Sequence, residues 1–221
     1  MADSDIALHP PELKHHFDDA PQQLEASTLG MWAFLATEVL FFGGMFCAYT
    51  IYRHAYHDAF ESTSRFMNVT IGGINTGVLI CSSLTMALAV RAAQLGQKKA
   101  LIWLLIATLT LGGVFLALKA DEYHEKYVEH HIPGPGFQYE EPRFAQQAQI
   151  LFFLYFAMTG LHAAHMIVGA GLLITLIVMA SRNRFSSRWY TPVDMIGLYW
   201  HFVDIVWIFL FPLLYLIGHT K

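Results

Sequence analysis

Residues 148–180 read AQILFFLYFAMTGLHAAHMIVGAGLLITLIVMA, a run of 33 residues with no charged side chain. A helix needs about 20 mostly apolar residues to cross the ~30 Å hydrocarbon core of a bilayer. Main-chain polar groups in lipid must be satisfied within their own segment, which favours a helix over a strand. The run therefore predicts one transmembrane helix, long enough to tilt or to project beyond the bilayer.

Four further segments of the chain have the same apolar character. The expected helices span about residues 29–52, 69–90, 100–118, 148–180 and 195–217. Only the first and the last contain a charged side chain, Glu38 and Asp204. We therefore expect an all-α, polytopic membrane protein in which residues 29–221 form a bundle of five transmembrane helices. Residues 1–28 would be an acidic cytoplasmic tail.

The composition excludes a protein surrounded by water. Of the 221 residues, 55% are hydrophobic and 14% are charged, whereas soluble domains carry about 25% charged residues. No basic patch indicates nucleic acid, so membrane lipids are the expected environment. The chain has no nucleophile–base pair, phosphate loop or CxxC motif, and we predict no catalytic site in it.

Basic residues in the links between helices predict the orientation. Two links share this character, with Arg91, Lys98 and Lys99 in one and Arg182, Arg184 and Arg188 in the other. Lys and Arg are enriched in cytoplasmic loops, which places both links and the N-terminus inside and the C-terminus outside. Lys119–Val128 is expected to continue the third helix beyond the membrane.

Glu38 and Asp204 are the two carboxyl groups expected within the membrane. Counted from the expected helix starts, each lies about 14 Å from the inner end. A carboxyl at such depth often marks a function or a contact with lipid or a subunit, and a structural acid bonded to a neighbouring helix is the alternative. His201 precedes Asp204 by three residues on the same helix face. We expect a structural His201–Asp204 pair, with a functional role as the alternative.

The remaining polar residues of the helices are expected to be structural. His162, His165 and His201 lie at expected depths too far apart for one metal or haem, so we predict no metal site. Small and weakly polar residues commonly join membrane helices. Those on one face of the second helix are Asn75, Ser82 and Ser83. The aromatic residues expected at the membrane interfaces are Trp103, Trp189, Tyr190 and Tyr199.

Five local patterns occur in one order along the chain. They are Glu38 within WAFLATEVLFFGG (32–44), Asn75-Thr76-Gly77 through Ser82-Ser83, Glu122-Tyr123, GLHAAHMIVG (160–169) and YWHFVDIVWIFL (199–210). Together they resemble subunit III of the haem–copper oxidases, in its five-helix bacterial form. The likeness covers residues 29–218. Relative to the seven-helix form, the chain lacks the first two helices, which form one wall of a lipid-holding cleft.

The resemblance implies a non-catalytic subunit of an aa3-type cytochrome c oxidase in a bacterial inner membrane. It would support the stability of subunit I, lipid binding and proton uptake. Haem and copper would belong to subunits I and II, and a small subunit IV and a supercomplex are possible further partners. Phospholipid is the only ligand implied for this chain. The motif residues carried over are Glu38, Asn75, Ser82, Ser83, Glu122, His162, His165, His201, Asp204 and Trp207.

Three alternatives remain open from the sequence. The chain could be subunit III of a quinol oxidase, or an accessory protein of a nitric oxide reductase. From another class, it could be a proton-coupled transporter that uses Glu38. Such transporters commonly have inverted repeats, and none stands out in this sequence.

Overall fold

The computed structural model describes residues 14, 17–64, 67–134, 136–139, 142–187 and 189–216. Five long helices dominate them: α2 (Ala20–Ala55), α4 (Val69–Gln94), α5 (Lys98–Val128), α6 (Ala145–Ser181) and α7 (Thr191–Tyr215). Each is long and apolar enough to cross a membrane. The described part also holds the short helix α3 (His57–Ser64) and a 3-10 turn, η1 (Pro142–Phe144), but no strand. The predicted all-α architecture with five spans is confirmed.

The first helix begins earlier than the apolar pattern indicated. α2 starts at Ala20, nine residues before Leu29, so residues 20–28 are helical. Asp19 caps this start because its carboxylate accepts a hydrogen bond from the Gln22 N–H at 2.8 Å. α5 continues to Val128, which confirms that Lys119–Val128 is helical, while its place beyond the membrane stays a prediction. Parts of the predictions lie outside the described residues, namely those on residues 1–13, 15–16, 188 and 217–221.

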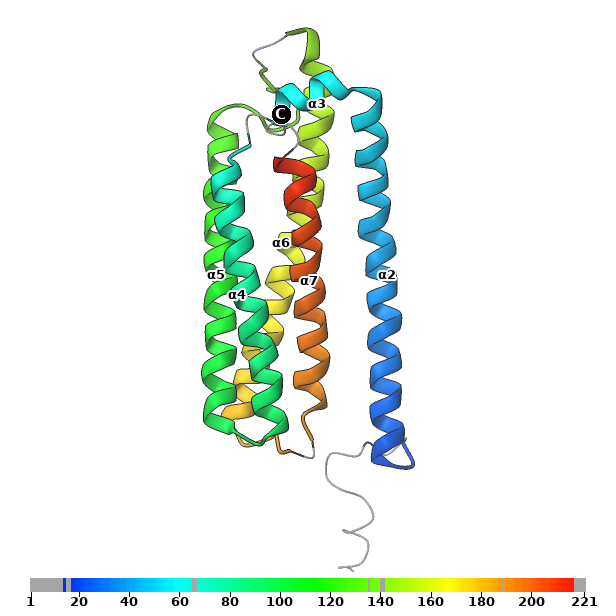
Figure 1. Cartoon of the computed structure of the whole chain (residues 1–221), viewed down its shortest axis with the longest axis vertical. Coiled ribbons are helices and arrows are strands. Elements are labelled where there is room, and N and C mark those ends of the chain that lie inside the picture. The colour runs from blue at the N-terminus through cyan, green and yellow to red at the C-terminus, as the bar shows by residue number, and fades with distance from the viewer. Residues whose placement is uncertain are drawn as a thin grey trace, which may run out of the picture.

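Helices α4, α5, α6 and α7 pack together, while α2 stands at one side against α7 and α6 (Figure 1). Within Ala20–Ala55 the buried side chains are Leu35, Phe42 and Tyr49, a single stripe with a spacing of seven. The Tyr49 hydroxyl donates to the Leu213 carbonyl at 2.6 Å. That carbonyl lies in the last turn of α7, where no intrahelical donor follows. A narrow seam therefore joins α2 to the rest.

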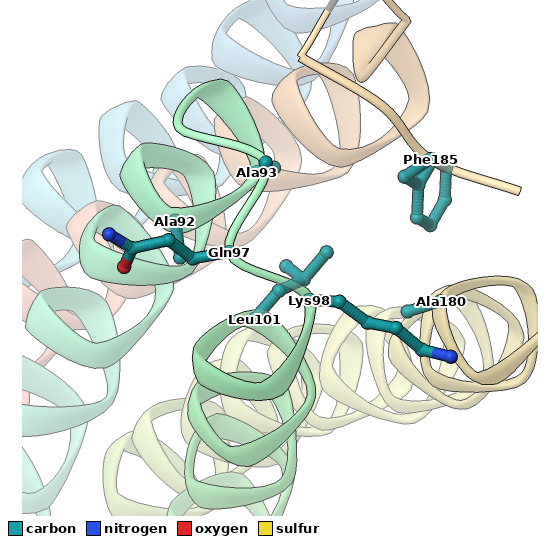
Figure 2. A pocket seen from close by; sticks show the side chains of 8 residues that line it. Ala92, Ala93, Gln97, Lys98, Leu101, Ala180 and Phe185 are labelled. Atoms are coloured by element: carbon teal, nitrogen blue, oxygen red, sulfur yellow. The ribbon is translucent and has the colours of Figure 1, made fainter. Parts of the chain in front are cut away.

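The two ends of the bundle differ in character. The α4–α5 and α6–α7 turns lie at the same end as the start of α2, and we call this the basic end (Figure 1). The opposite end, which holds α3 and the α5–α6 link, is called the α3 end. At the basic end, Lys98 extends from the α4–α5 turn towards the end of α6 (Figure 2). Its Nζ donates to the Ser181 carbonyl at 3.0 Å and so satisfies a helix-end acceptor.

Trp200 of α7 fills the centre of the four-helix cluster. A Cβ atom on Gly112 or on Gly169 would lie 2.9 Å from the Trp200 ring, so α5 and α6 approach it closely only because these residues are glycine. The indole N–H donates to Ser82 Oγ of α4 at 3.0 Å. This packing fixes α7 against three neighbouring helices.

Candidate functional site

Glu38 of α2 and His165 of α6 meet where these two helices pack. Glu38 Oε2 lies 3.2 Å from His165 Nε2, and the side chains are 18% and 16% exposed. The Phe42 ring packs edge-on against the imidazole with 5.3 Å between centroids. The Tyr199 hydroxyl donates to the His165 carbonyl at 2.9 Å. The sequence did not predict this pair, because nothing local joins two residues so far apart in the chain.

The hydrogen bonds of His165 determine how many protons the pair shares. His165 Nδ1 lies 2.9 Å from the Leu161 carbonyl oxygen, and since a carbonyl only accepts, Nδ1 carries a hydrogen. For the bond to Glu38, either the carboxylic acid donates to a neutral ring or a protonated ring donates to the carboxylate. In both forms one proton lies between Glu38 Oε2 and His165 Nε2. The pair is therefore a single-proton unit.

The two carboxyl groups lie near the middle of their helices, and their depth within a membrane stays a prediction. Glu38 lies 18 residues after Ala20 and His165 lies 16 residues before Ser181, which gives similar heights of about 27 and 24 Å from the basic end. Asp204 lies 13 residues after Thr191, a height of about 20 Å. Both carboxyl groups thus lie at mid-length, because α2 and α7 begin earlier than expected.

His162 lies one turn from His165 but packs quite differently. Its ring is fully buried, 5.4 Å from the centroid of Phe115 and 5.2 Å from that of Trp207. Neither ring nitrogen has a hydrogen-bond partner among the described residues. The same part of the chain contains no group of three His, Cys, Asp or Glu side chains that could hold a metal. His162 thus packs as one ring of an aromatic cluster.

The predicted His201–Asp204 pair is wrong. His201 turns towards α4, where its Nδ1 lies 2.7 Å from Ser83 Oγ. Asp204 is 2% exposed, and although Ser83 is close enough to influence it, neither carboxyl oxygen has a hydrogen-bond partner in the described structure. All three residues line a cavity of about 270 Å³ between α4 and α7. We call it the α4–α7 pocket.

A buried charge network near the α3 end went unpredicted. Lys119 Nζ lies 2.9 Å from Glu122 Oε2 and donates to the hydroxyls of Tyr155 and Tyr215 at 3.0 and 2.8 Å. Both hydroxyls donate to Glu122 Oε1, at 2.8 and 2.6 Å. The sequence contained one sign of this network, because Lys119 and Glu122 carry opposite charges and lie three residues apart on one helix. The two tyrosines come from α6 and α7, so no local pattern could have included them.

The other motif residues join α7 to its neighbours. Trp207 donates from its indole N–H to Thr76 Oγ1 at 3.1 Å. Asn75 is fully buried on the same helix as Thr76, and its side-chain amide has no hydrogen-bond partner within the described part.

Tyr199 is 5% exposed, so its predicted place at the membrane interface is wrong. Its ring packs inside the bundle beside His165.

The chain is similar over nearly all its length to one family of membrane proteins. The family model described as "Cytochrome c oxidase subunit III" matches residues 15–219. The chain is 30% identical to the cytochrome bo(3) ubiquinol oxidase subunit 3 of Pseudomonas aeruginosa, over 94% of this chain and 92% of that protein. It is 31% identical to the cytochrome c oxidase subunit 3 of Corynebacterium diphtheriae, over 90% and 94%. It is 30% identical to the subunit of that name from Latimeria chalumnae, over 84% of this chain and 67% of that protein.

Proposed function

The chain belongs to the cytochrome c oxidase subunit III family, and from this premise we propose that it is the non-catalytic subunit III of an aa3-type cytochrome c oxidase in aerobic respiration. Its partners would be subunits I and II, which hold the haem and copper. A small subunit IV and a respiratory supercomplex would be further partners. The chain would support the stability of subunit I, bind phospholipid and keep proton uptake fast.

The Glu38–His165 pair is the observation that carries this proposal. It combines a family motif glutamate with a histidine of a second motif in one single-proton unit, at the middle of two membrane helices. An ionisable pair at such depth is expensive unless it serves a contact or a function. Both side chains keep some exposure. We infer that the pair contacts phospholipid or subunit I at the edge of α2.

The basic end supports an orientation with the N-terminus inside. Arg91, Lys98 and Lys99 lie at this end together with Arg182 and Arg184. We propose that this end faces the cytoplasm of a bacterial inner membrane. The acidic tail at the N-terminus would then be cytoplasmic and the C-terminus external.

The relatives differ in the electron donor that their names give, so this part of the proposal has an alternative. One is named as a ubiquinol oxidase subunit and another as a cytochrome c oxidase subunit. A role in a quinol oxidase is therefore the main alternative. A nitric oxide reductase accessory protein and a proton-coupled transporter are the more distant ones.

A purification and a spectrum test the proposal. The chain would be tagged at its C-terminus, extracted from its native membrane in a mild detergent, and examined by a reduced-minus-oxidised visible spectrum. We expect haem bands and larger subunits to accompany it, with band positions of haem a and with oxidation of reduced cytochrome c. Haem of another type with quinol oxidation would support the quinol alternative. A lone, colourless protein of 25.0 kDa would contradict membership of an oxidase.

Deleting the chain tests the supporting role. Oxidase purified from the deletion strain should start turnover at nearly the rate of the complete enzyme and then lose activity within fewer turnovers. An unchanged active lifetime would contradict the supporting role, while a complete loss of initial turnover would contradict its non-catalytic nature. A strain that expresses the chain from a plasmid provides the control.

A further inference from the structure

Asp204 is a buried acid whose carboxyl oxygens meet no hydrogen-bond donor in good geometry among the described residues, although Ser83 is close enough to influence it. The side chain lies mid-way along α7 and is 2% exposed. A buried polar group without a partner is expensive, and within a membrane more so. The carboxyl lines the α4–α7 pocket. A hydrogen-bond partner from outside the chain can therefore reach Asp204 through that pocket.

The pocket has a polar floor and an apolar rim. Ser83, His201 and Asp204 line it, and His201 uses Nδ1 for its bond to Ser83. The rim residues are exposed at the surface of α4 and α7: Ile80, Leu84, Ile205 and Ile208. Binding pockets are commonly lined by apolar side chains with a few polar groups that fix the orientation of what binds. The volume of about 270 Å³ admits side chains of another helix.

Depth and chemistry decide between the candidate occupants. Asp204 lies 13 residues from Thr191 and 11 from Tyr215, so it is about 20 and 17 Å from the two ends of α7. A lipid headgroup at either surface does not reach that depth, and an acyl chain supplies no hydrogen-bond donor. A cation at mid-depth would itself be expensive. A neutral donor on another membrane helix meets all of these conditions.

We propose that the α4–α7 pocket docks a transmembrane helix of a partner subunit, whose neutral amide, hydroxyl or indole donor bonds to Asp204. This rests on the proposed function only in that the chain has a membrane-embedded partner. Close helix packing and a hydrogen bond support the site within the chain itself. A Cβ atom on Gly197 would lie 2.9 Å from Val90 Cγ2, so α4 and α7 are in close contact beside it. Ser83 holds the ring of His201 in place.

A photoreactive side chain identifies what covers the pocket. p-Benzoylphenylalanine would replace Leu84 at the rim in the tagged chain within the native complex, and replace Ile174 on the exposed face of α6 as the control for background. After irradiation, we expect Leu84→p-benzoylphenylalanine to form a covalent product with a membrane subunit that mass spectrometry maps to a transmembrane helix. Products with lipid alone, or with a second copy of this chain, would overturn the proposal.

Substitutions of Asp204 test the hydrogen bond itself. Asp204→Leu should lower the amount of partner that co-purifies with the chain at least tenfold. Asp204→Asn keeps a carbonyl acceptor and should retain the partner within about threefold. Both isolated chains should elute as folded monomers in detergent, which separates lost docking from misfolding. Full recovery of the partner with Asp204→Leu would overturn the proposal, and so would equal losses for the two variants.

The two proposals fail separately in these experiments. If the unmodified chain brings no haem-containing subunit from the membrane, the proposed function is contradicted whatever Asp204 does. If the haem-containing complex is recovered in full with Asp204→Leu, the docking site is contradicted and the proposed function stands.

Discussion

Among the described residues, Glu122 of the Lys119–Glu122 network and Asp204 of the α4–α7 pocket are both only 2% exposed, and the two acids differ in their hydrogen-bond partners. In the network, each N–H of the Lys119 ammonium has an acceptor, and Glu122 accepts from two tyrosines. In the pocket, the Asp204 carboxyl has no partner in the described structure. The first region is complete within the chain, while the second is complete only with a partner.

The contrast separates residues that serve the fold from residues that serve the assembly. A closed polar network specifies how its own helices pack, and it becomes expensive when one member is lost. An open polar site lowers the stability of the free chain, because its buried polar group has no hydrogen-bond partner there. Assembly removes this cost when the partner supplies the missing hydrogen bond. The Glu38–His165 pair lies between these cases, being satisfied internally and still partly exposed.

Lys119→Met should have the largest effect on the chain itself. It leaves the Glu122 carboxylate buried without its counter-charge, and losses of this kind lower the free energy of unfolding by about 3–5 kcal/mol. Unfolding of the purified chain in mixed detergent micelles, followed by tryptophan fluorescence, would measure it.

The matched control is the double variant Lys119→Met with Glu122→Gln. It removes both charges and keeps an acceptor for the two tyrosine hydroxyls. We expect it to recover most of the lost stability, because neutral replacement of a buried ion pair is often well tolerated. A double variant as unstable as the single one would show that charge pairing is not what stabilises this region.

Glu38→Leu should destabilise the chain less, by about 1–2 kcal/mol. It removes the partner of His165 Nε2, although Nδ1 keeps its bond to Leu161. In Glu38→Gln the amide N–H can donate to the neutral ring, so the same unfolding titration should give a value close to that of the unchanged chain. If Glu38→Gln is as unstable as Glu38→Leu, the single-proton description of the pair is wrong.

The smallest effect is expected outside the membrane spans, at Glu129. Partial burial raises the pKa of this carboxyl, but the hydrogen bonds and charges of Lys126 and His131 outweigh it and hold the pKa below its ordinary value. A carboxyl with a lowered pKa in the folded state stabilises the fold above its ordinary pKa, and this contribution is lost as the pH falls through the lowered value. The described part of the α5–α6 link should therefore lose order in acid.

Hydrogen exchange corrected for the intrinsic effect of pH would measure that loss. Protection of residues 129–134 should fall between about pH 5 and pH 3. Glu129→Gln should show lower protection at neutral pH and little further change in acid. An equal acid response in both chains would assign it to other groups.

The fold could be predicted from the sequence because hydrophobic length alone identifies a membrane-spanning helix. Hydropathy indicates which residues are apolar enough for lipid, however, and not where a helix begins. It therefore missed the polar turns at the start of α2, residues 20–28. The cap signal was present, with Asp19 accepting from Gln22 and Pro21 in the first turn. A start read from the cap would have placed Glu38 at mid-length.

The candidate site could be predicted only as a set of residues. The motifs named Glu38, His165, His201 and Asp204, but the partners were decided by packing between helices. Local spacing favoured His201 with Asp204, whereas the ring turned across to Ser83 on α4. Lys119 was visible as a charge beside Glu122, but the tyrosines that complete its network lie on other helices.

The stability of isolated Asp204→Leu tests most directly the claim that the pocket is built for a partner. Replacing an unpartnered buried carboxyl by an apolar side chain should raise the free energy of unfolding of the free chain by about 1–3 kcal/mol, while the same change weakens the complex. Unfolding titrations of the free chain and its variant would measure the first effect beside the co-purified yield. A variant that is less stable as a free chain would contradict the account, because Asp204 would then belong to the fold.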